Sequence, residues 1–413
     1  MAISLCMIVK DEASTLGQAL ASVKGIVDEI IVVDTGSTDG SQAIAAAHGA
    51  RVYPFTWVND FAAARNASLG YATGDWVLVL DADEVLCPAG AEVLRRLDQG
   101  DNLGNIAAET VIAVNLLRLE LGAPQTPYTL ITRCFRRLPE ISFERPYHET
   151  VDDSVARIQT QSPGWQVVTA EDIALHHTGY APEAVAQRGK FDRARTLMEP
   201  YLAQHPDDSY LANKLAALYI EEDRPELALP LLDRALANRA ALDPLTRYEL
   251  HYHRGLAHGK RHPDQAATAY QTALDQPVPP KLKLATWINY GSLKKSQGDL
   301  AGAIGLFEQA IAADPTLAIA HYNLGTAHRA RGYLDEAIAA YRQAIALCPD
   351  YAEAHQNLGV ALVKLGQLPA AMESFGKAVA FYRVTNPAAA ESLKQGVKAL
   401  NLPPFLLAQA HLE

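Results

Sequence analysis

A 34-residue period in the second half of the chain constrains its fold more than any other feature of the sequence. Four kinds of position carry this period: Asn289, Asn323 and Asn357; Gly291, Gly325 and Gly359, with Gly298, Gly332 and Gly366; Ala303, Ala337 and Ala371; Phe307, Tyr341 and Phe375. A unit of this length forms one pair of helices, which buries its apolar face only by stacking on neighbouring pairs. The pattern therefore predicts a row of helix pairs, with small residues where helices cross and an aromatic side chain between units.

Prolines complete this pattern and identify it. Pro315 and Pro349 close two of the units, and the whole set is the signature of tetratricopeptide repeats. Two looser units are expected over 207–239 and 242–280, before the regular ones. The stretch 386–400 is expected to form a capping helix that covers the apolar face of the last repeat.

The first part of the chain has a different rhythm, in which short apolar runs alternate with helical segments. The expected strands are 3–9, 29–34, 51–55 and 76–80, and the expected helices are 16–23, 41–47 and 61–71. Continuous apolar runs of this length are typical of parallel strands covered on both faces. We therefore predict an α/β domain with a mostly parallel sheet, followed by an all-α superhelix of repeats.

Charge and cysteine usage limit the class of protein. The net charge of −11 is concentrated in residues 1–190, which hold 24 acidic and 14 basic residues. This balance argues against a general nucleic-acid-binding protein, and it indicates either a cation site or a solvated acidic surface. The four cysteines are far apart, the N-terminus lacks the pattern of a signal peptide, and no segment approaches the roughly 20 apolar residues of a membrane span. We expect reduced thiols in a cytoplasmic protein, with peripheral membrane association left open.

Carboxylates follow two of the expected strands, where ligands of such sheets bind. Asp81 and Asp83 come directly after an apolar run and can point into one crevice. A divalent cation held there would neutralise the charge that grows on a departing diphosphate; a solvated loop or helix cap is the alternative. Asp34 follows another strand and suits ribose hydroxyls or a base N–H, whereas an Asx turn would explain it equally well.

Several motifs in order resemble glycosyltransferase family 2: ISLCMIVKDE at 3–12, EIIVVDTGSTDGS at 29–41, DFAAARN at 60–66 and DAD at 81–83. Three later motifs, followed by repeats, resemble the branch with the sublancin peptide S-glycosyltransferase and many bacterial relatives: RCFR at 133–136, YHE at 147–149 and HTGY at 177–180. The resemblance implies a GT-A fold and an inverting, metal-dependent sugar transfer. We expect a glycosyltransferase domain over 1–190, repeats over 191–385 and a capping helix and tail over 386–413.

The resemblance also implies roles for individual residues. The nucleotide-sugar donor, expected to be a UDP-sugar, would be contacted by Lys10, Glu12, Asp34, Arg65, Asn66 and Asp81. Asp83 would ligate Mn²⁺ or Mg²⁺, and His177 would add a metal or diphosphate contact, although a histidine such as His177 or its neighbour His176 is more often structural.

Inverting transfer also needs a base on the acceptor side. Glu149, with His148 beside it, is the candidate, although family members commonly have an acid–Asp pair at this stage of the fold. Glu149 could equally form a structural ion pair with Arg145 or Arg136. The arginines of the RCFR segment, together with Arg137, would face the diphosphate or solvate the edge of a strand.

The repeat asparagines complete the predicted sites. Asn289, Asn323 and Asn357 fall on the first helix of their units, and a row of amides can pair with the backbone of an extended peptide. The alternative is that asparagine is simply common at this position. The leading hypothesis is transfer of a hexose or N-acetylhexosamine to a protein side chain by a protein that could be a homo-oligomer. The alternatives are transfer to a glycan or lipid-linked acceptor, and a non-catalytic scaffold.

Overall fold

The computed structural model describes residues 1–123, 125–178, 187–238, 242–259, 261–400, 403 and 407–408. Gly179 and Tyr180, the end of the HTGY motif, lie outside these residues. The chain forms two compact units, Met1–Leu242 and Asp243–Glu413. Among the described residues, no helix combines the length and the apolar character needed to cross a bilayer.

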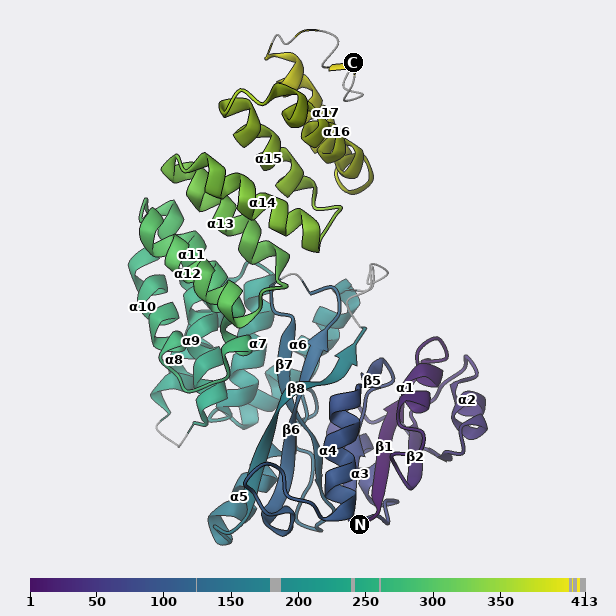
Figure 1. Cartoon of the computed structure of the whole chain (residues 1–413). Helices are drawn as coiled ribbons and strands as arrows, with labels where there is room; N and C mark the ends of the chain where they lie inside the picture. Colours follow the sequence, from purple (N-terminus) through teal and green to yellow (C-terminus); the bar gives the residue numbers. More distant parts are fainter. Residues whose placement is uncertain are drawn as a thin grey trace. The chain divides into compact units, whose positions relative to one another are not determined.

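The first unit is built on an eight-stranded sheet with the order β3-β2-β1-β4-β7-β6-β8-β5. Its strands are β1 (Ile3–Val9), β2 (Glu29–Asp34), β3 (Arg51–Pro54), β4 (Trp76–Val79), β5 (Glu84–Leu86), β6 (Val111–Glu120), β7 (Tyr128–Arg136) and β8 (Gln166–His177). The four strands from β3 to β4 pair in parallel, as do β6 and β8, whereas β7 runs antiparallel to β4 and β6, and β5 to β8. The predicted α/β fold with a mostly parallel sheet is confirmed (Figure 1).

Helices cover both faces of this sheet because successive strand residues point to opposite sides. The helices are α1 (Leu16–Ser22), α2 (Ser41–Ala47), α3 (Phe61–Leu69), α4 (Pro88–Gln99) and α5 (Asp152–Gln161), with a 3₁₀ turn at Ala108–Thr110. Leu5 and Met7 of β1 share one apolar core with residues of α1 and α4, whereas Cys6 between them belongs to a second core with residues of α3 and α5. An apolar core therefore lies on each face of the sheet.

Three further helices belong to the same compact unit as the sheet: α6 (Gln187–Gln204), α7 (Ser209–Glu221) and α8 (Pro225–Ala237). The segment 207–239 was expected to form a loose repeat, and α7 and α8 occupy it as a packed pair. The domain boundary expected at residue 190 stays a prediction.

The second unit consists of helices that follow one another along the chain, and Figure 1 shows α13 and α14, and α15 and α16, lying side by side. The helices are α9 (Pro244–His258), α10 (Pro263–Leu274), α11 (Leu284–Ser296), α12 (Leu300–Ala313), α13 (Ala318–Arg331), α14 (Leu334–Leu347), α15 (Ala352–Lys364), α16 (Leu368–Thr385) and α17 (Pro387–Lys398), with a 3₁₀ turn at Pro280–Lys283. The predicted tetratricopeptide architecture is confirmed. Helix α17 adds Ala390 and Val397 to the apolar cluster of the last repeat.

A glycine packed on an aromatic ring joins the two helices of each regular unit. A Cβ on Gly291, Gly325 or Gly359 would lie 2.6–2.7 Å from ring atoms of the aromatic residue on the next helix, Phe307, Tyr341 and Phe375 respectively. The looser unit of α9 and α10 uses the same contact, between Gly255 and Tyr270, with a Cβ distance of 2.4 Å. Gly291, Gly325 and Gly359 therefore serve close packing. Gly298, Gly332 and Gly366 do not lie at a helix crossing, because an added Cβ would meet no atom within 4 Å; their φ values of +84°, +88° and +76° instead provide the left-handed turn after the first helix of each unit.

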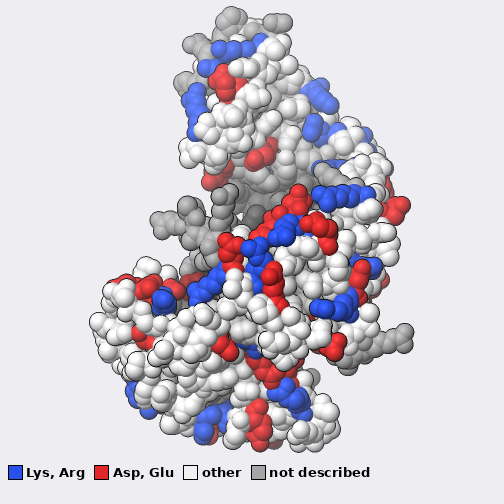
Figure 2. Space-filling view, turned by 180° about the vertical axis from the view of Figure 1, so that it is seen from behind, with Lys and Arg blue, Asp and Glu red and all other residues white. Residues whose placement is uncertain are grey.

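Acidic and basic side chains lie interleaved across the middle of the face shown in Figure 2. The net charge of −11 is therefore not gathered into a single acidic area on that face.

Candidate active site

The strand order creates a switch point between β1 and β4, because β2 lies on one side of β1 and β4 on the other. Residues 10–12 and 81–83 leave the carboxyl ends of these two strands, where open α/β sheets bind ligands. Burial raises the pKa of Glu12, and the negative charges of Asp83 and Asp81 raise it further. The structure thus brings Glu12, Asp81 and Asp83, which the sequence predicted as one site, within electrostatic reach of one another.

The loop after β1 is held by the loop after β2. Asp11 accepts a hydrogen bond from the backbone N–H of Thr38 at 2.7 Å, and the Ser41 hydroxyl accepts one from the backbone N–H of Glu12 at 2.8 Å. Asp11 has a φ of +56°, a left-handed conformation that residues other than glycine seldom adopt. Lys10 is exposed beside this fixed loop, and its contact with the donor stays a prediction.

Asp34 is buried at the end of β2, and its carboxylate is occupied by its own loop. It accepts hydrogen bonds from the backbone N–H groups of Gly36 and Ser37, both at 3.2 Å, and from the Gln42 side chain at 2.7 Å. Burial opposes ionisation, but these hydrogen bonds outweigh it and lower the pKa of Asp34. The Asx-turn interpretation accounts for these contacts, and the nucleoside contact stays a prediction.

Two buried arginines hold Asp81. Arg65 from α3 forms an ion pair with one carboxylate oxygen and Arg133 from β7 with the other. Burial would raise the pKa of Asp81, but the charges of Arg133 and Arg65 hold it far below its ordinary value. These charges favour the ionised form of Asp81, and of the RCFR arginines it is Arg133 that pairs with the acidic cluster.

The fully buried Glu84, the first residue of the edge strand β5, extends this network to β6. Its carboxylate pairs with Arg133 at 2.8 Å and with Arg118 of β6 at 2.5 Å, and it accepts the backbone N–H of Asp81 at 2.9 Å. Glu84 thus fixes the conformation of the turn that carries Asp83. The sequence analysis assigned no role to Glu84 or Arg118.

His177 lies between two carboxylates at the end of β8. Its Nε2 is 3.1 Å from Asp83, and its Nδ1 is 2.5 Å from Glu120, which Arg118 also contacts at 2.7 Å. Burial lowers the pKa of His177, but the hydrogen bonds to Asp83 and Glu120 prevail and raise it to about 9. The pairing of β5 with β8, which sets Glu84 opposite His177, brings the histidine to the aspartates.

The candidate base Glu149 joins the same network. Its Oε1 accepts a hydrogen bond from Arg65 Nε at 2.7 Å, so one arginine links Glu149 to Asp81. The ion pairs considered for Glu149 with Arg145 or Arg136 do not form. Arg145 binds two other carboxylates, and Arg136 stacks on Trp76 and Trp165 while donating to backbone carbonyls.

Its neighbour His148 is exposed with a φ of +54°, and its ring packs edge-on against Tyr147. Strained conformations of this kind cluster at functional sites.

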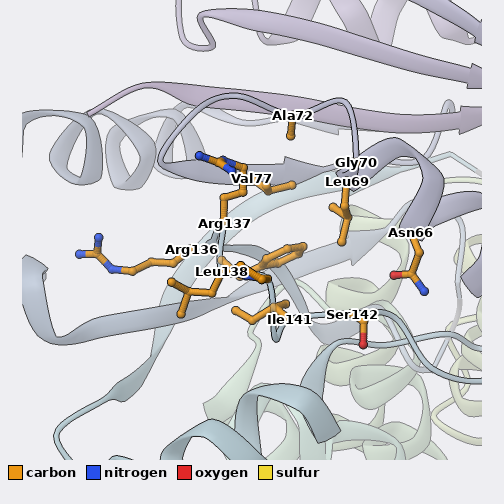
Figure 3. A pocket seen from close by; sticks show the side chains of 12 residues that line it. Asn66, Leu69, Gly70, Ala72, Val77, Arg136, Arg137, Leu138, Ile141 and Ser142 are labelled. Atoms are coloured by element: carbon orange, nitrogen blue, oxygen red, sulfur yellow. The ribbon is translucent and has the colours of Figure 1, made fainter.

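Asn66 has contacts that the sequence analysis did not expect. Its amide donates to the backbone carbonyl of Phe143 at 2.9 Å and accepts from the N–H of the same residue at 2.8 Å. Asn66 also lines a cavity of about 480 Å³ that includes Val77 and Arg137 (Figure 3). Arg137 donates to the carbonyl of Gly74, before β4, so this cavity lies at the amino end of β4, whereas the acidic cluster follows its carboxyl end. The donor contact predicted for Asn66 stays a prediction.

The three repeat asparagines are not equivalent. Asn289 donates to the Tyr252 hydroxyl at 3.2 Å and Asn357 to the Tyr322 hydroxyl at 2.9 Å, so each bonds to the preceding repeat. Within the described part of the chain, the side-chain amide of Asn323 forms no hydrogen bond. The corresponding position before Asn323 is Ile288, which has no hydroxyl to offer.

Comparisons with known proteins agree with this arrangement. Residues 4–120 match the model of glycosyl transferase family 2, and tetratricopeptide repeat models match 183–244, 291–330, 325–366 and 352–383. The chain is 42% identical over 315 residues to a TPR repeat-containing protein of Synechococcus elongatus, which covers 76% of each chain. It is 28% identical over 190 residues to an uncharacterized glycosyltransferase of Rickettsia felis, covering 46% of this chain and 66% of that one.

A more distant relative is the SPbeta prophage-derived glycosyltransferase SunS of Bacillus subtilis. The identity is 26% over 243 residues, which cover 56% of this chain and 52% of SunS, so the chain matches about half the length of that relative. The matches place the family 2 domain on the sheet that carries the acidic cluster and the repeats on the helices that follow. The chain therefore belongs to the glycosyltransferases in which a family 2 domain precedes tetratricopeptide repeats.

Proposed function

We propose that the protein transfers a sugar from a UDP-sugar to a polypeptide side chain, with inversion at the anomeric carbon and with the help of Mn²⁺ or Mg²⁺. The observation that carries this proposal is the Asp83–His177 pair at the switch point, backed by Glu120. Carboxylate–histidine pairs of this kind, with a second carboxylate on the other ring nitrogen, orient histidine for metal ligation.

The donor atoms of this pair fit a divalent cation. Asp83 Oδ2 and His177 Nε2 are 3.1 Å apart, close to the roughly 3 Å between neighbouring ligands of an octahedral ion with bonds of about 2.1 Å. No group of three or more His, Cys, Asp or Glu residues suited to a metal occurs among the described residues. Of the described residues, Asp83 and His177 would hold the cation. Glu120, on the other ring nitrogen, would keep the imidazole oriented toward the cation, which would supply positive charge against the departing diphosphate.

The acceptor side depends on Glu149. An inverting transfer needs a base that takes the proton of the acceptor nucleophile while the nucleophile bonds to the anomeric carbon and the bond to the diphosphate breaks. Arg65 holds Oε1 of Glu149 and leaves Oε2 as the proton acceptor. The same arginine binds Asp81, so the acceptor and donor sides share a rigid link.

The repeats support a polypeptide acceptor. The Asn323 amide offers one donor and one acceptor to an extended backbone. Nearby, Lys295 donates to Thr326, one turn along α13 from Asn323. The chain's motif resemblance to a peptide-modifying transferase points to the same class of acceptor.

Incubation of the purified protein with a panel of nucleotide sugars and either cation tests the proposal. We expect UDP binding by calorimetry that strengthens with Mn²⁺ or Mg²⁺, and a mass increase of one hexose or N-acetylhexosamine on a peptide encoded beside the gene. Labelling of a glycan or lipid instead of the peptide would show that the acceptor is not a polypeptide. Absence of nucleotide binding, with and without metal, would refute the proposal.

A further inference from the structure

The candidate base lies in a short closed loop, Glu144–Thr150, whose ends pair with each other. Glu144 and Thr150 form an isolated antiparallel bridge, with N–H···O distances of 3.0 and 3.4 Å. Within this 144–150 loop, Arg145 and His148 have φ values of +80° and +54°. Non-glycine residues keep such conformations only where surrounding contacts enforce them. The contacts that do so therefore determine where Glu149 lies.

Arg145 anchors the first half of the loop. Its guanidinium is buried, donates to Asp153 of α5 and to Asp208, both at 2.6 Å, and lies over the Tyr210 ring with 4.8 Å to the centroid. Asp208 also accepts the backbone N–H of Leu211 at 2.9 Å through its other oxygen and so caps the N-terminus of α7. One carboxylate therefore ties the first helical repeat to the 144–150 loop.

The second half of the loop is anchored on α3. The carbonyl of Pro146 accepts the backbone N–H of Phe61 at 3.0 Å, and the Tyr147 ring packs edge-on against Phe61 at 5.5 Å. Arg193 of α6 lies over the rings of both Phe61 and Trp57, at 5.1 Å from each centroid. Helix α6 and the first helix of the repeat formed by α7 and α8 thus support both halves of the loop.

We propose that Asp208 and Arg145 are positioning residues of the transfer reaction, and that the first helical repeat is thereby part of the acceptor-side machinery. Neither residue contacts the acidic cluster at Asp81 and Asp83. Their contribution acts through the backbone of the 144–150 loop, which sets the orientation of Glu149 relative to Arg65. The proposal rests on the assignment of Glu149 as the base.

The substitution Asp208→Asn tests this coupling with little disturbance of the helix, because asparagine caps helices as well as aspartate does. It removes the charge that Arg145 binds. The matched control is Asp299→Asn at the N-cap of α12, where Asp299 likewise caps through Gly302 and pairs with a base, Lys294, at 3.0 Å. Arg145→Lys, which keeps the charge without the planar fork, gives a graded second variant.

We expect Asp208→Asn to lower kcat at least tenfold, since misplacement of a catalytic group by about 1 Å costs about a hundredfold. Its UDP-sugar affinity should match that of Asp299→Asn, although its unfolding temperature should be lower because Asp208 is a buried partner of Arg145. The kcat of Arg145→Lys should fall between those of Asp208→Asn and wild type. Equal loss of kcat in both asparagine variants, or none in either, would overturn the proposal.

Hydrogen exchange of peptides covering residues 144–150 keeps the test independent of turnover. Faster exchange is expected in Asp208→Asn and not in Asp299→Asn, and unchanged exchange would refute the positioning role even if no transfer is detected. If Glu149→Gln keeps wild-type kcat while Asp208→Asn speeds exchange, the assignment of the base fails and the anchoring of the loop stands.

Discussion

The acidic cluster of the sheet is stabilised by contacts between residues far apart in the sequence, whereas the helices of the second unit are stabilised by contacts between residues close together in the sequence. In the cluster, Arg65 binds Glu149 across 84 residues of the chain, and Arg133 binds Asp81 across 52 residues. In the repeats, the decisive packing contact joins a glycine to an aromatic residue on the next helix, as between Gly325 and Tyr341. The comparison teaches that the repeats are built from local, replaceable contacts, whereas each residue of the cluster depends on several distant partners.

Asp83→Ala should have the largest effect on turnover and should leave the fold unchanged. Loss of a cation ligand should lower kcat on the order of a thousandfold, because a cation contributes several kcal/mol to the stabilisation of transition-state charge. Steady-state turnover with Mn²⁺ measures this, and circular dichroism checks the fold. The exposed Asp172→Ala on β8 is the control and should keep full activity. Undiminished turnover of Asp83→Ala would refute the metal site.

Glu84→Gln tests the claim that cluster residues depend on one another. The substitution removes the fully buried carboxylate that Arg118 and Arg133 share and leaves each arginine with one partner, Glu120 and Asp81 respectively. Breaking this buried network should cost about 3 to 5 kcal/mol of unfolding free energy. Glu373→Gln, which removes an exposed pair with Lys377 on α16, should cost well under about 1 kcal/mol. Denaturant unfolding gives both values, and similar losses would erase the distinction between the two regions.

Gly325→Ala tests close packing in the repeats. A Cβ there would meet the Tyr341 ring at 2.7 Å, and overpacking of this kind should cost about 1 to 3 kcal/mol. Gly305→Ala, inside α12 with no atom within 4 Å of the added Cβ, should instead stabilise the unit by about 0.5 to 1 kcal/mol. Thermal unfolding compares the two variants, and the same sign for both would contradict the packing role of the periodic glycines.

The smallest effect should distinguish the repeat asparagines. Asn289→Ala loses its bond to Tyr252 and should cost about 1 kcal/mol of stability, with little effect on peptide affinity. Asn323→Ala should leave stability unchanged and weaken binding of an acceptor peptide about fivefold to tenfold. Fluorescence anisotropy measures the affinity. Equal peptide affinity of Asn323→Ala and wild type would remove Asn323 from the predicted groove.

The fold of the repeats could be predicted from the sequence because the same residue types recur at single positions every 34 residues. The unit of α9 and α10 was expected only loosely, since Gly255 precedes Gly291 by 36 residues instead of 34. The glycine and the aromatic residue of this unit are 15 residues apart instead of 16, and Gly291 follows Tyr270 by 21 residues instead of the regular 18. The longer spacing therefore lies between α10 and α11, in the segment that contains the 3₁₀ turn at Pro280–Lys283.

The site was predictable only in part. Strand ends indicated Glu12, Asp81 and Asp83, which the structure brings together, but a motif does not reveal partners across the sheet. The sequence analysis did not identify Arg118 and Glu120, which lie in an apolar strand. Two charged residues separated by one position point to the same face of a strand, and this spacing would have indicated a buried polar network. The carboxylate of Asp34 is occupied by the backbone of its own loop, whereas the amide of Asn66 bonds to the backbone of Phe143, 77 residues away; no motif specified either contact.

The membership of α6 to α8 in the same compact unit as the sheet bears on how repeat arrays can be exchanged between such enzymes. A recombination event, natural or engineered, that joined a new array at residue 190 would discard the carboxylate that holds Arg145. A junction at Leu242–Asp243 would bring in foreign repeats and would keep the 144–150 loop together with all of its contacts to α6 and α7. Diversification of acceptor recognition in this lineage should therefore leave its crossover points downstream of α8.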